Sequence, residues 1–357
     1  MPLPLPGDDG QVQFMFTVAR LTPGSSQPRR PETDEEEMLK CMQLYKLGVP
    51  LYTREAILNA YGQLKVSKRG DAIKIIAIDG TSVDFIINTG RVWVGADGYE
   101  RELIRVAHRV ITRDPITKER FEYGVTAFEK VRLNLFTTLH FWRNSPYYQL
   151  LRYLLDEYPK MPRITKIIGF DCGSMSRDMQ GQPSNNSRAR YQHAFLIALK
   201  EYLDARNFET TGQEVRVYVQ NETYLERDIE VIRQFGVQVL QDPEGFLVID
   251  EETVVFACRP ECPVRQIVAD LAMPAMMIWD RERDSTRVNG VPVQRIFDPW
   301  STRLDSMMRF YHVQDFLNDE INFDKMDVCI RRPMADVYYG LNDPGPGGDA
   351  NIAQPVA

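Results

Sequence analysis

The sequence contains few of the residues that build disulfide scaffolds or metal sites. It has only 5 cysteines (positions 41, 172, 258, 262 and 329) and 4 histidines in 357 residues. A secreted disulfide scaffold has a denser and usually even set of cysteines, so we expect free thiols and a reducing compartment, cytoplasmic or nuclear. The sequence also lacks a paired Cys-x-x-Cys, His-Glu-x-x-His, a phosphate loop, a nucleophile elbow and the kinase motifs. No well-known catalytic class is therefore indicated by motif.

Long apolar runs are missing as well. Residues 1–6 are interrupted by proline and lack a basic start followed by an apolar segment, and no later stretch approaches membrane-spanning length. The net charge is −7, which repels phosphate backbones. We therefore expect a small molecule or a protein as partner, and neither a nucleic acid nor a membrane.

Composition divides the chain into five predicted parts. Both ends are rich in small and polar residues and poor in large apolar ones, so we predict a disordered leader over residues 1–33 and a disordered tail over 342–357. Between them we predict an N-terminal α+β extension (34–160), a core (161–282) and a C-terminal helical cover (283–341).

The extension contains the clearest local signals. Acidic residues at 34–37 indicate the start of a helix, and Thr53 is suited to cap a second one. Two strand-like segments within residues 72–87 flank Asp79-Gly80, a dipeptide that favours a tight hairpin turn. We therefore predict two helices followed by a β-hairpin.

A helical pattern follows over residues 127–158. Apolar residues recur at helical spacing, and Pro146 interrupts them, so two helices in series are predicted. Aromatic residues at such spacing are usually core rather than a surface for a base or a cofactor. We therefore assign to the core the aromatic residues Phe141, Trp142, Tyr147 and Tyr148.

Strand and helix patterns alternate along the central segment. The predicted strands are 164–169, 215–219, 237–240, 246–249, 253–257 and 275–279, and the predicted helices are 188–206, 225–235 and 263–271. Such alternation is typical of an α/β fold with a Rossmann-like, mainly parallel sheet flanked by helices. Beyond it we predict an amphipathic helix over 304–317 that covers the sheet.

Ordered blocks in this segment carry a family resemblance. They are Ile167–Ser174, Arg190–Ala194, Val217–Tyr224, Gly236–Gly245 and Pro260–Asp270. Together they resemble the "sensitivity to red light reduced" (SRR-like) domain family, especially its fungal members. The resemblance implies a regulatory role, because the family is tied to circadian input in plants, to heme synthesis and clock expression in animals, and to microtubule-related processes in yeast. It implies no settled chemistry.

The sequence departs from the family pattern at two positions. Relatives tend to carry Asp-Pro where this chain has Asn221-Glu222, and many carry Pro-His-Cys where it has Pro260-Glu261-Cys262. A binding or catalytic role that relatives have at these positions is therefore not carried over to this chain.

The loop after the first central strand is the leading candidate site, because doubly wound folds bind ligands at the carboxyl ends of parallel strands. Gly169 and Gly173 permit close backbone approach, Asp171 and Ser174 are polar, and the amides that begin the following helix could hold an anion. The loop is closer to the first motif of methyltransferases than to Gly-x-Gly-x-x-Gly, although Met175 replaces a glycine that would help a nucleoside to fit. The alternative is that the glycines serve turn geometry alone.

The end of the second central strand offers another candidate. Glu222 could accept hydrogen bonds from a ribose, as acidic residues do in nucleotide-binding sheets. The structural alternative is that Asn221 or Thr223 caps the next helix, with Glu222 near its positive end.

Cysteine and histidine chemistry is only weakly indicated. Cys262 precedes a proline, as in some heme-sensing proteins, so it is a weak heme ligand candidate, and no metal site is predicted. His193 could face Cys172 as the base of a nucleophile pair, but a packed or hydrogen-bonded histidine is the simpler interpretation.

Three functional hypotheses follow. The first is a regulatory or ligand-sensing protein without catalytic turnover. The second is a divergent methyltransferase that uses S-adenosylmethionine, with Asp171, Gly173 and Glu222 as cofactor contacts and no identified catalytic residue. The third is a protein interaction module formed by the helices at 127–158 and 304–317. Whether the protein is an enzyme stays open at this point.

Overall fold

The structure is a computed structural model. It describes residues 31–68, 70–87, 92–94, 100–103, 110–113, 116, 126–158, 160–176, 183–210, 212–221, 223–281, 287–288, 291–292, 298, 300–319 and 321–333. The predicted tail and residues 1–30 of the predicted leader lie outside the described residues, and so does Glu222.

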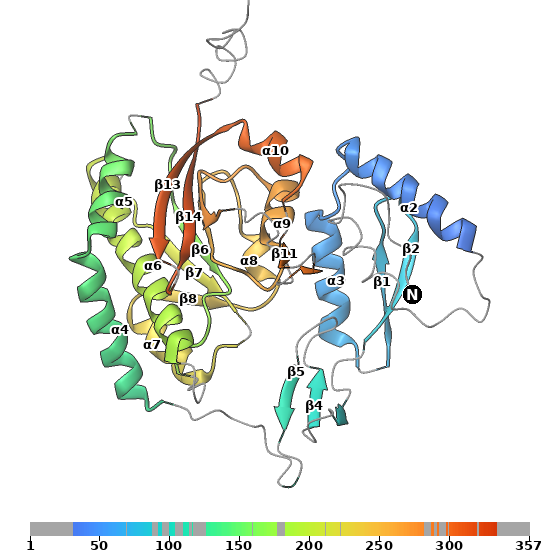
Figure 1. Cartoon of the computed structure of the whole chain (residues 1–357), viewed down its shortest axis with the longest axis horizontal. Coiled ribbons are helices and arrows are strands. Elements are labelled where there is room, and N and C mark those ends of the chain that lie inside the picture. Colours follow the sequence, from blue (N-terminus) through green and yellow to red (C-terminus); the bar gives the residue numbers. More distant parts are fainter. Residues whose placement is uncertain are drawn as a thin grey trace, which may run out of the picture.

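A seven-stranded mixed sheet forms the centre of the molecule (Figure 1), in the order β13-β14-β10-β9-β6-β7-β8. Its strands are β6 (Lys166–Phe170), β7 (Arg216–Gln220), β8 (Val237–Leu240), β9 (Thr253–Ala257), β10 (Met276–Asp280), β13 (Tyr311–Asp319) and β14 (Asp324–Arg331). The five strands from β10 to β8 are parallel, whereas β14 runs antiparallel to both β10 and β13. The predicted α/β class and mainly parallel sheet are confirmed.

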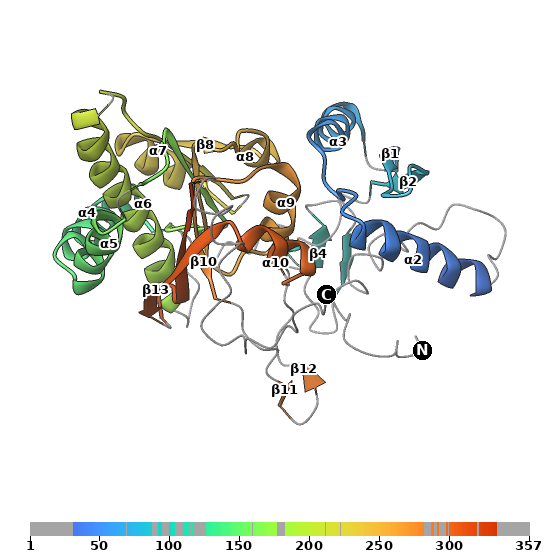
Figure 2. The same cartoon turned by 90° about the horizontal axis from the view of Figure 1, so that it is seen from above.

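Helices cover both faces of this sheet because the strand side chains alternate between two apolar layers. Ile167, Val217 and Val254 belong to one buried cluster, and Ile168 and Val255 belong to the other. The first layer is covered by α4 (Phe128–Arg143), α5 (Pro146–Asp156), α6 (Pro183–Thr210) and α7 (Glu226–Gln234), and the second by α8 (Glu244–Leu247), α9 (Val264–Leu271) and α10 (Thr302–Met308). Figure 2 shows the two sets of helices on opposite sides of the strands.

Two predictions about the core region are wrong. Residues 246–249, predicted as a strand, form the end of α8 and a turn, since Phe246 is buried from a short helix rather than from the sheet. The helix predicted over 304–317 ends at Met308, and the chain continues into the hairpin β13–β14. That hairpin pairs with β10, as in the register pair Met277 and Cys329, and so covers an edge that a helix would have left open. Among the described residues of the predicted C-terminal cover, β-structure is therefore more extensive than helix.

The N-terminal extension has the predicted helices and hairpin. Its elements are α2 (Pro31–Lys46), α3 (Arg54–Val66), the hairpin β1 (Ala72–Ile76) and β2 (Ser82–Ile86), and the three-stranded sheet β3 (Val92–Val94), β4 (Glu100–Leu103) and β5 (Val110–Arg113). Thr53 caps α3 by accepting a hydrogen bond from the Ala56 amide at 3.1 Å. Gly80 has a φ of +83° in the turn between β1 and β2, which explains the glycine there. A further pair of two-residue strands, β11 (Arg287–Val288) and β12 (Val291–Pro292), follows β10.

The extension is fixed to the core through α9 and α10. The carboxylate of Asp270 at the end of α9 accepts hydrogen bonds from the amides of Leu51 (2.7 Å) and Tyr52 (2.9 Å) and forms an ion pair with Arg303 of α10. Arg303 also donates to the carbonyl of Val49 at 2.6 Å. The Asp270 side chain is only 3% exposed, so these bonds form in a buried contact.

The helix pair α4–α5 also follows the prediction, with one exception. Ser145 caps α5 and Pro146 occupies its first turn, so the proline separates two helices as expected. Trp142 is buried and Tyr147 packs against the core, but Phe141 is 61% exposed, so its assignment to the core is wrong. Within the described residues, no helix combines the length and the hydropathy that a membrane span needs.

Candidate functional site

The strand order defines a switch point between β6 and β9. The chain leaves β6 toward α6 on one face of the sheet and leaves β9 toward α9 on the other face, although the two strands are parallel neighbours. In doubly wound folds, ligands bind at the carboxyl ends of strands where the connections diverge in this way. We call residues 171–176 and 258–263 the switch-point loops. The sequence predicted the first of these loops as a site but not its pairing with the second.

Asp171 joins the two switch-point loops. Its carboxylate accepts a hydrogen bond from the Glu261 amide at 2.8 Å and lies 3.6 Å from the Cys262 sulfur, whose thiol donates to it. Asp171 has a φ of +52°, a left-handed conformation that a non-glycine residue adopts at some cost. The predicted site residue Asp171 is therefore held in position across the switch point.

Arg259 in the second loop has the same unusual backbone conformation. Its φ is also +52°, its amide donates to the Asp280 carboxylate at 3.0 Å, and its guanidinium forms an ion pair with the buried Asp324. Asp324 itself has a φ of +72°. These three residues are the non-glycine positions with positive φ in the described part of the chain, and all lie at the carboxyl edge of the parallel strands. Strained positions of this kind cluster at functional sites.

Gly169 and Gly173 have different roles. A Cβ on Gly169 would lie 2.6 Å from Leu196 Cδ1 and 3.1 Å from Cys172 Sγ, so this glycine permits the close contact between β6 and α6. Gly173 has a φ of +79°, which favours glycine, and a Cβ there would meet only Ala189 at 3.5 Å. The packing explanation applies to Gly169 and the turn explanation to Gly173.

Ser174 and the amides that follow it are bonded to a buried carboxylate. Asp228 of α7 accepts hydrogen bonds from Ser174 Oγ (2.6 Å), from the amides of Met175 (3.0 Å) and Ser176 (2.8 Å), and from the amide of Leu225 (2.9 Å). Asp228 is 0% exposed. An internal anion therefore uses the amides of this loop, and a ligand at the switch point would have to use other donors.

The end of β7 forms a turn instead of the predicted helix cap. The Asn221 side chain accepts hydrogen bonds from the amide and the hydroxyl of Thr223 at 2.7 and 2.6 Å. The helix α7 begins later, at Glu226, where the Asp228 carboxylate takes the capping role by accepting from Leu225. Asn221 and Thr223 are thus not the caps of this helix, and Glu222 lies outside the described residues.

His193 and Cys172 do not form a nucleophile and base. His193 Nδ1 donates to the Ala189 carbonyl at 2.6 Å, which leaves Nε2 to accept from the Tyr224 hydroxyl at 2.8 Å. Burial lowers the pKa of His193 and raises that of the Cys172 thiol well above its usual value. The packed histidine is therefore confirmed, and Cys172 is a buried neutral thiol near the Phe170 carbonyl.

The cysteines after β9 lie in separate environments. The buried Cys258 donates to the Phe323 carbonyl at 2.7 Å and accepts from Arg188 at 3.0 Å, and burial raises its pKa to about 11 despite that arginine. Cys262, the weak heme candidate, is half-buried beside Asp171. Within the described residues, no three His, Cys, Asp or Glu side chains are grouped so that they could hold a metal ion.

Arg265 and Asp298 form a buried pair behind the second switch-point loop. The Asp298 carboxylate accepts from the amide and the Nε of Arg265 at 2.8 and 3.1 Å. Burial raises the pKa of Asp298 to about 6, although Arg265 acts in the opposite direction. Nothing in the sequence pattern indicated this pair or the residues Asp228 and Arg259.

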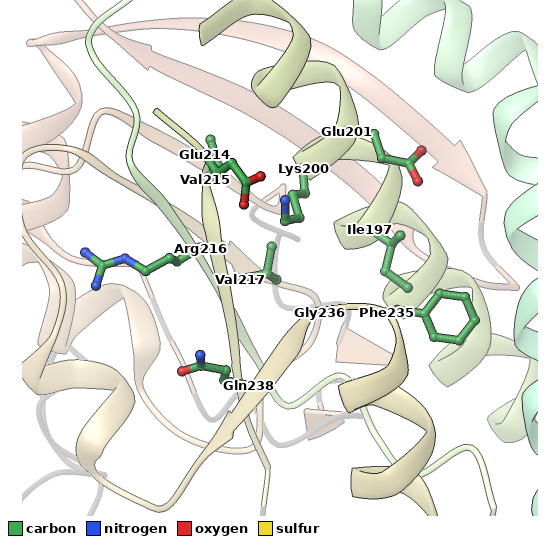
Figure 3. A pocket seen from close by; sticks show the side chains of 10 residues that line it. All are labelled: Ile197, Lys200, Glu201, Glu214, Val215, Arg216, Val217, Phe235, Gly236 and Gln238. Atoms are coloured by element: carbon green, nitrogen blue, oxygen red, sulfur yellow. The ribbon is translucent and has the colours of Figure 1, made fainter. Parts of the chain in front are cut away.

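A pocket of about 420 Å³ lies at the opposite, amino-terminal edge of β7 and β8 (Figure 3). Its charged lining is partly paired, since Lys200 bonds to Asp204 and Glu201 to Arg143. It contains none of the predicted site residues, and its lining is Ile197, Lys200, Glu201, Glu214, Val215, Arg216, Val217, Phe235, Gly236 and Gln238. The fold places ligand sites at the other edge, so we retain the switch-point loops as the candidate site.

Comparison with known proteins gives one family. Residues 150–325 match the family model described as SRR1 domain. The matched residues include the main sheet up to the start of β14 and both switch-point loops. No curated protein matches the chain.

Proposed function

Because residues 150–325 belong to the SRR1 domain family, we propose that this chain is a regulatory protein that binds a small molecule at the switch-point loops without catalytic turnover. The family supports a regulatory type of domain in general. The observation that carries the ligand-binding part is the bridge from Asp171 to Glu261 and Cys262, where two left-handed residues face the divergence of β6 and β9.

The chemistry of the loops favours binding over catalysis. Both nitrogens of His193 are engaged, and the thiols of Cys172 and Cys258 have raised pKa values, which disfavours a thiolate nucleophile. Asp171 and Arg259 are already bonded within the protein. Such groups can orient a ligand, and His193, Cys172 and Cys258 are not arranged as an activated nucleophile with its base.

The test combines thermal unfolding with amide chemical shifts of the full chain. S-adenosylmethionine, NAD and heme are added separately, and a probe at 100 times its dissociation constant stabilises the folded state by about 2.7 kcal/mol. We expect a stabilising probe to shift the amide resonances of Gly173 and Glu261. Shifts confined to Lys200 and Phe235 would instead assign binding to the pocket of Figure 3 and refute the proposed site.

Two matched variants make this test sharper. Asparagine tolerates the left-handed conformation, so Asp171→Asn removes the carboxylate without new backbone strain. We expect this variant to change the affinity for the probe, whereas Glu214→Gln in the other pocket leaves it unchanged. Gly173→Val is unsuitable, because a branched residue at a φ of +79° strains the loop by itself.

A second candidate function, methyl transfer from S-adenosylmethionine, is favoured by the topology. Numbered 1 to 7 in chain order, the strands of the main sheet lie in the order 6-7-5-4-1-2-3, with the seventh antiparallel to its neighbours. Doubly wound sheets of this kind bind nucleotide cofactors at the switch point, which is a likeness of fold and not of site.

The first loop fits the cofactor poorly. Met175 is 2% exposed and its amide is bonded to Asp228, so neither a glycine opening nor a free amide is present there. We therefore place this candidate second. Binding of S-adenosylmethionine that Asp171→Asn abolishes, together with methyl transfer to any acceptor in a cell extract, would reverse that order.

The remaining parts of the proposal concern partners and place. We propose that the protein acts in the cytoplasm or the nucleus and that it belongs to the fungal branch of the family. We also propose that a protein partner binds the ligand-bound and ligand-free forms with different affinities. Imaging of a fluorescently tagged chain would test the location, and affinity purification with and without the bound probe would test the partner.

A further inference from the structure

Helix α4 carries apolar side chains on two opposite faces. Its inner face is buried in the core through Val131, Leu135, Thr138, Leu139 and Trp142. On the outer face, Leu133, Phe136 and Phe141 are 61%, 59% and 61% exposed. A surface helix normally has one apolar face toward the core and a polar face toward solvent, so the second apolar face of α4 is unusual. Figures 1 and 2 both show α4 at the outer margin of the molecule, on the side away from α2 and α3.

The outer face of α4 is continuous along the helix. We define it as Leu133, Phe136, Thr137, His140 and Phe141, which follow the spacing i, i+3, i+4, i+7 and i+8. The rings of His140 and Phe141 pack edge to face, with centroids 6.2 Å apart. Exposed apolar patches of this kind mark interaction sites. This helix lies outside the residues that match the SRR1 domain.

The arrangement of this face is self-complementary. Leu133 and Phe141 lie four residues to either side of Thr137, so all three share one ridge of the helix. If two copies of α4 cross antiparallel at Thr137, Leu133 of each copy meets Phe141 of the other. The small threonine at the crossing lets the helices approach closely, and a two-fold axis uses the same patch on both copies.

The charges at the two ends of α4 complement each other in the same arrangement. Lys130 is exposed and makes no ion pair or hydrogen bond with the described residues. At the other end, Arg143 is paired with Glu201 of α6, which is 43% exposed. The antiparallel crossing brings Lys130 of one copy toward the Arg143–Glu201 end of the other, where Glu201 lies between two cations. A parallel crossing would place two Lys130 side chains together.

We propose that the outer face of α4 is the interface of a two-fold symmetric homodimer. None of the five residues of this face belongs to the switch-point loops, although the chain just before α4 contacts the first loop, where the Thr126 amide donates to the Ser176 carbonyl at 2.8 Å.

The mass of the full chain in solution, measured by light scattering during gel filtration, tests the interface. We expect twice the chain mass of 41.3 kDa for the wild-type protein. Phe136→Glu and Phe141→Glu each bury a charge and should weaken association by about 30-fold or more, which is the effect of a single hot-spot residue. The matched control is Phe208→Glu on α6, where the side chain is 80% exposed, and it should remain a dimer. Unchanged circular dichroism shows that the variants fold.

A cysteine at the crossing point distinguishes this geometry from other dimers. Thr137→Cys places one thiol of each copy at the two-fold axis, so mild oxidation should give a covalent dimer, whereas Glu230→Cys on the exposed side of α7 should not. A monomeric wild-type protein would overturn the proposal and leave the face to a different partner. Dimers that survive both glutamate substitutions, or that fail to cross-link through Thr137→Cys, would also overturn it.

Discussion

Replacing Asp228 should destabilise the protein more than any surface substitution, because one buried carboxylate holds the first switch-point loop. It accepts 4 hydrogen bonds: from Ser174 Oγ and from the amides of Met175, Ser176 and Leu225. Alanine leaves these donors buried without an acceptor, at about 1–3 kcal/mol each. The carboxylate's own desolvation penalty is relieved at the same time, and water enters the gap. We therefore expect Asp228→Ala to lower the free energy of unfolding by about 4 kcal/mol.

The isosteric variant separates hydrogen bonding from volume. Asp228→Asn keeps one acceptor oxygen, which can serve the amides of Met175 and Ser176, and the Ser174 hydroxyl can turn to accept from the new amide. Only the Leu225 amide then loses its acceptor, because it faces the NH₂ group of the new asparagine. We expect a loss of about 2 kcal/mol, half that of alanine.

Urea unfolding followed by circular dichroism measures both losses. Glu230→Ala, on the exposed side of the same helix, is the control and should change stability by less than about 0.5 kcal/mol. Hydrogen exchange should also show loss of protection at the Met175 and Ser176 amides in the alanine variant. A loss below about 1 kcal/mol for Asp228→Ala, or equal losses for alanine and asparagine, would refute this account of the loop.

Three further changes test other parts of the structure. Gly169→Ala should lower the free energy of unfolding by about 1–3 kcal/mol, because the added methyl group overpacks against α6. Gly62→Ala in α3, where a Cβ would meet nothing within 4 Å, should raise the free energy of unfolding by about 0.5–1 kcal/mol in the same urea assay. Asp270→Ala should lower the free energy of unfolding by about 3–5 kcal/mol, because Arg303 stays buried without its partner. Limited proteolysis of this variant should cleave the extension first. Asp298 has a folded pKa of about 6, raised from 3.8, so it is protonated more readily when folded; its contribution to the free energy of unfolding should fall by about 2 kcal/mol as the pH rises from 4 to 6, and Asp298→Asn should flatten that slope.

Local signals in the sequence were sufficient for most elements of the fold. The spacing of apolar residues predicted α4 and α5, Thr53 marked the start of α3, and Asp79-Gly80 marked the hairpin. The errors arose where tertiary context decides. Leu304, Met307 and Tyr311 fit a helical stripe, but residues 311–319 form β13, which pairs with β14, and β14 in turn pairs with the edge of β10.

The residues of the candidate site could be predicted from the sequence only in part, for a related reason. The sequence placed Asp171 and Gly173 at the end of a strand, which the structure confirms, because that position depends on local pattern. The contact of Asp171 with Glu261 spans 90 residues, and the buried Asp228 is 54 residues from Ser174. A single sequence does not show which distant loops meet. The exposed Phe141 illustrates the same limit, since helical spacing indicates two apolar faces but not which of them is covered.

The closed state of the switch point constrains how a ligand could act there. Asp171 already bonds to the second loop, so a ligand that enters between the loops must supply replacement partners for the Glu261 amide and the Cys262 thiol. Breaking these bonds costs free energy each time a ligand enters, and an enzyme would meet that cost in every catalytic cycle. A sensor, in contrast, needs a stable ligand-free state. The ligand then replaces the hydrogen bonds of that state with its own. The second loop leads directly into α9, whose last turn holds the extension through Asp270, so the candidate site and the anchor of residues 51 and 52 lie on consecutive segments of the chain. The bonds that close the site therefore support the regulatory proposal over the catalytic one.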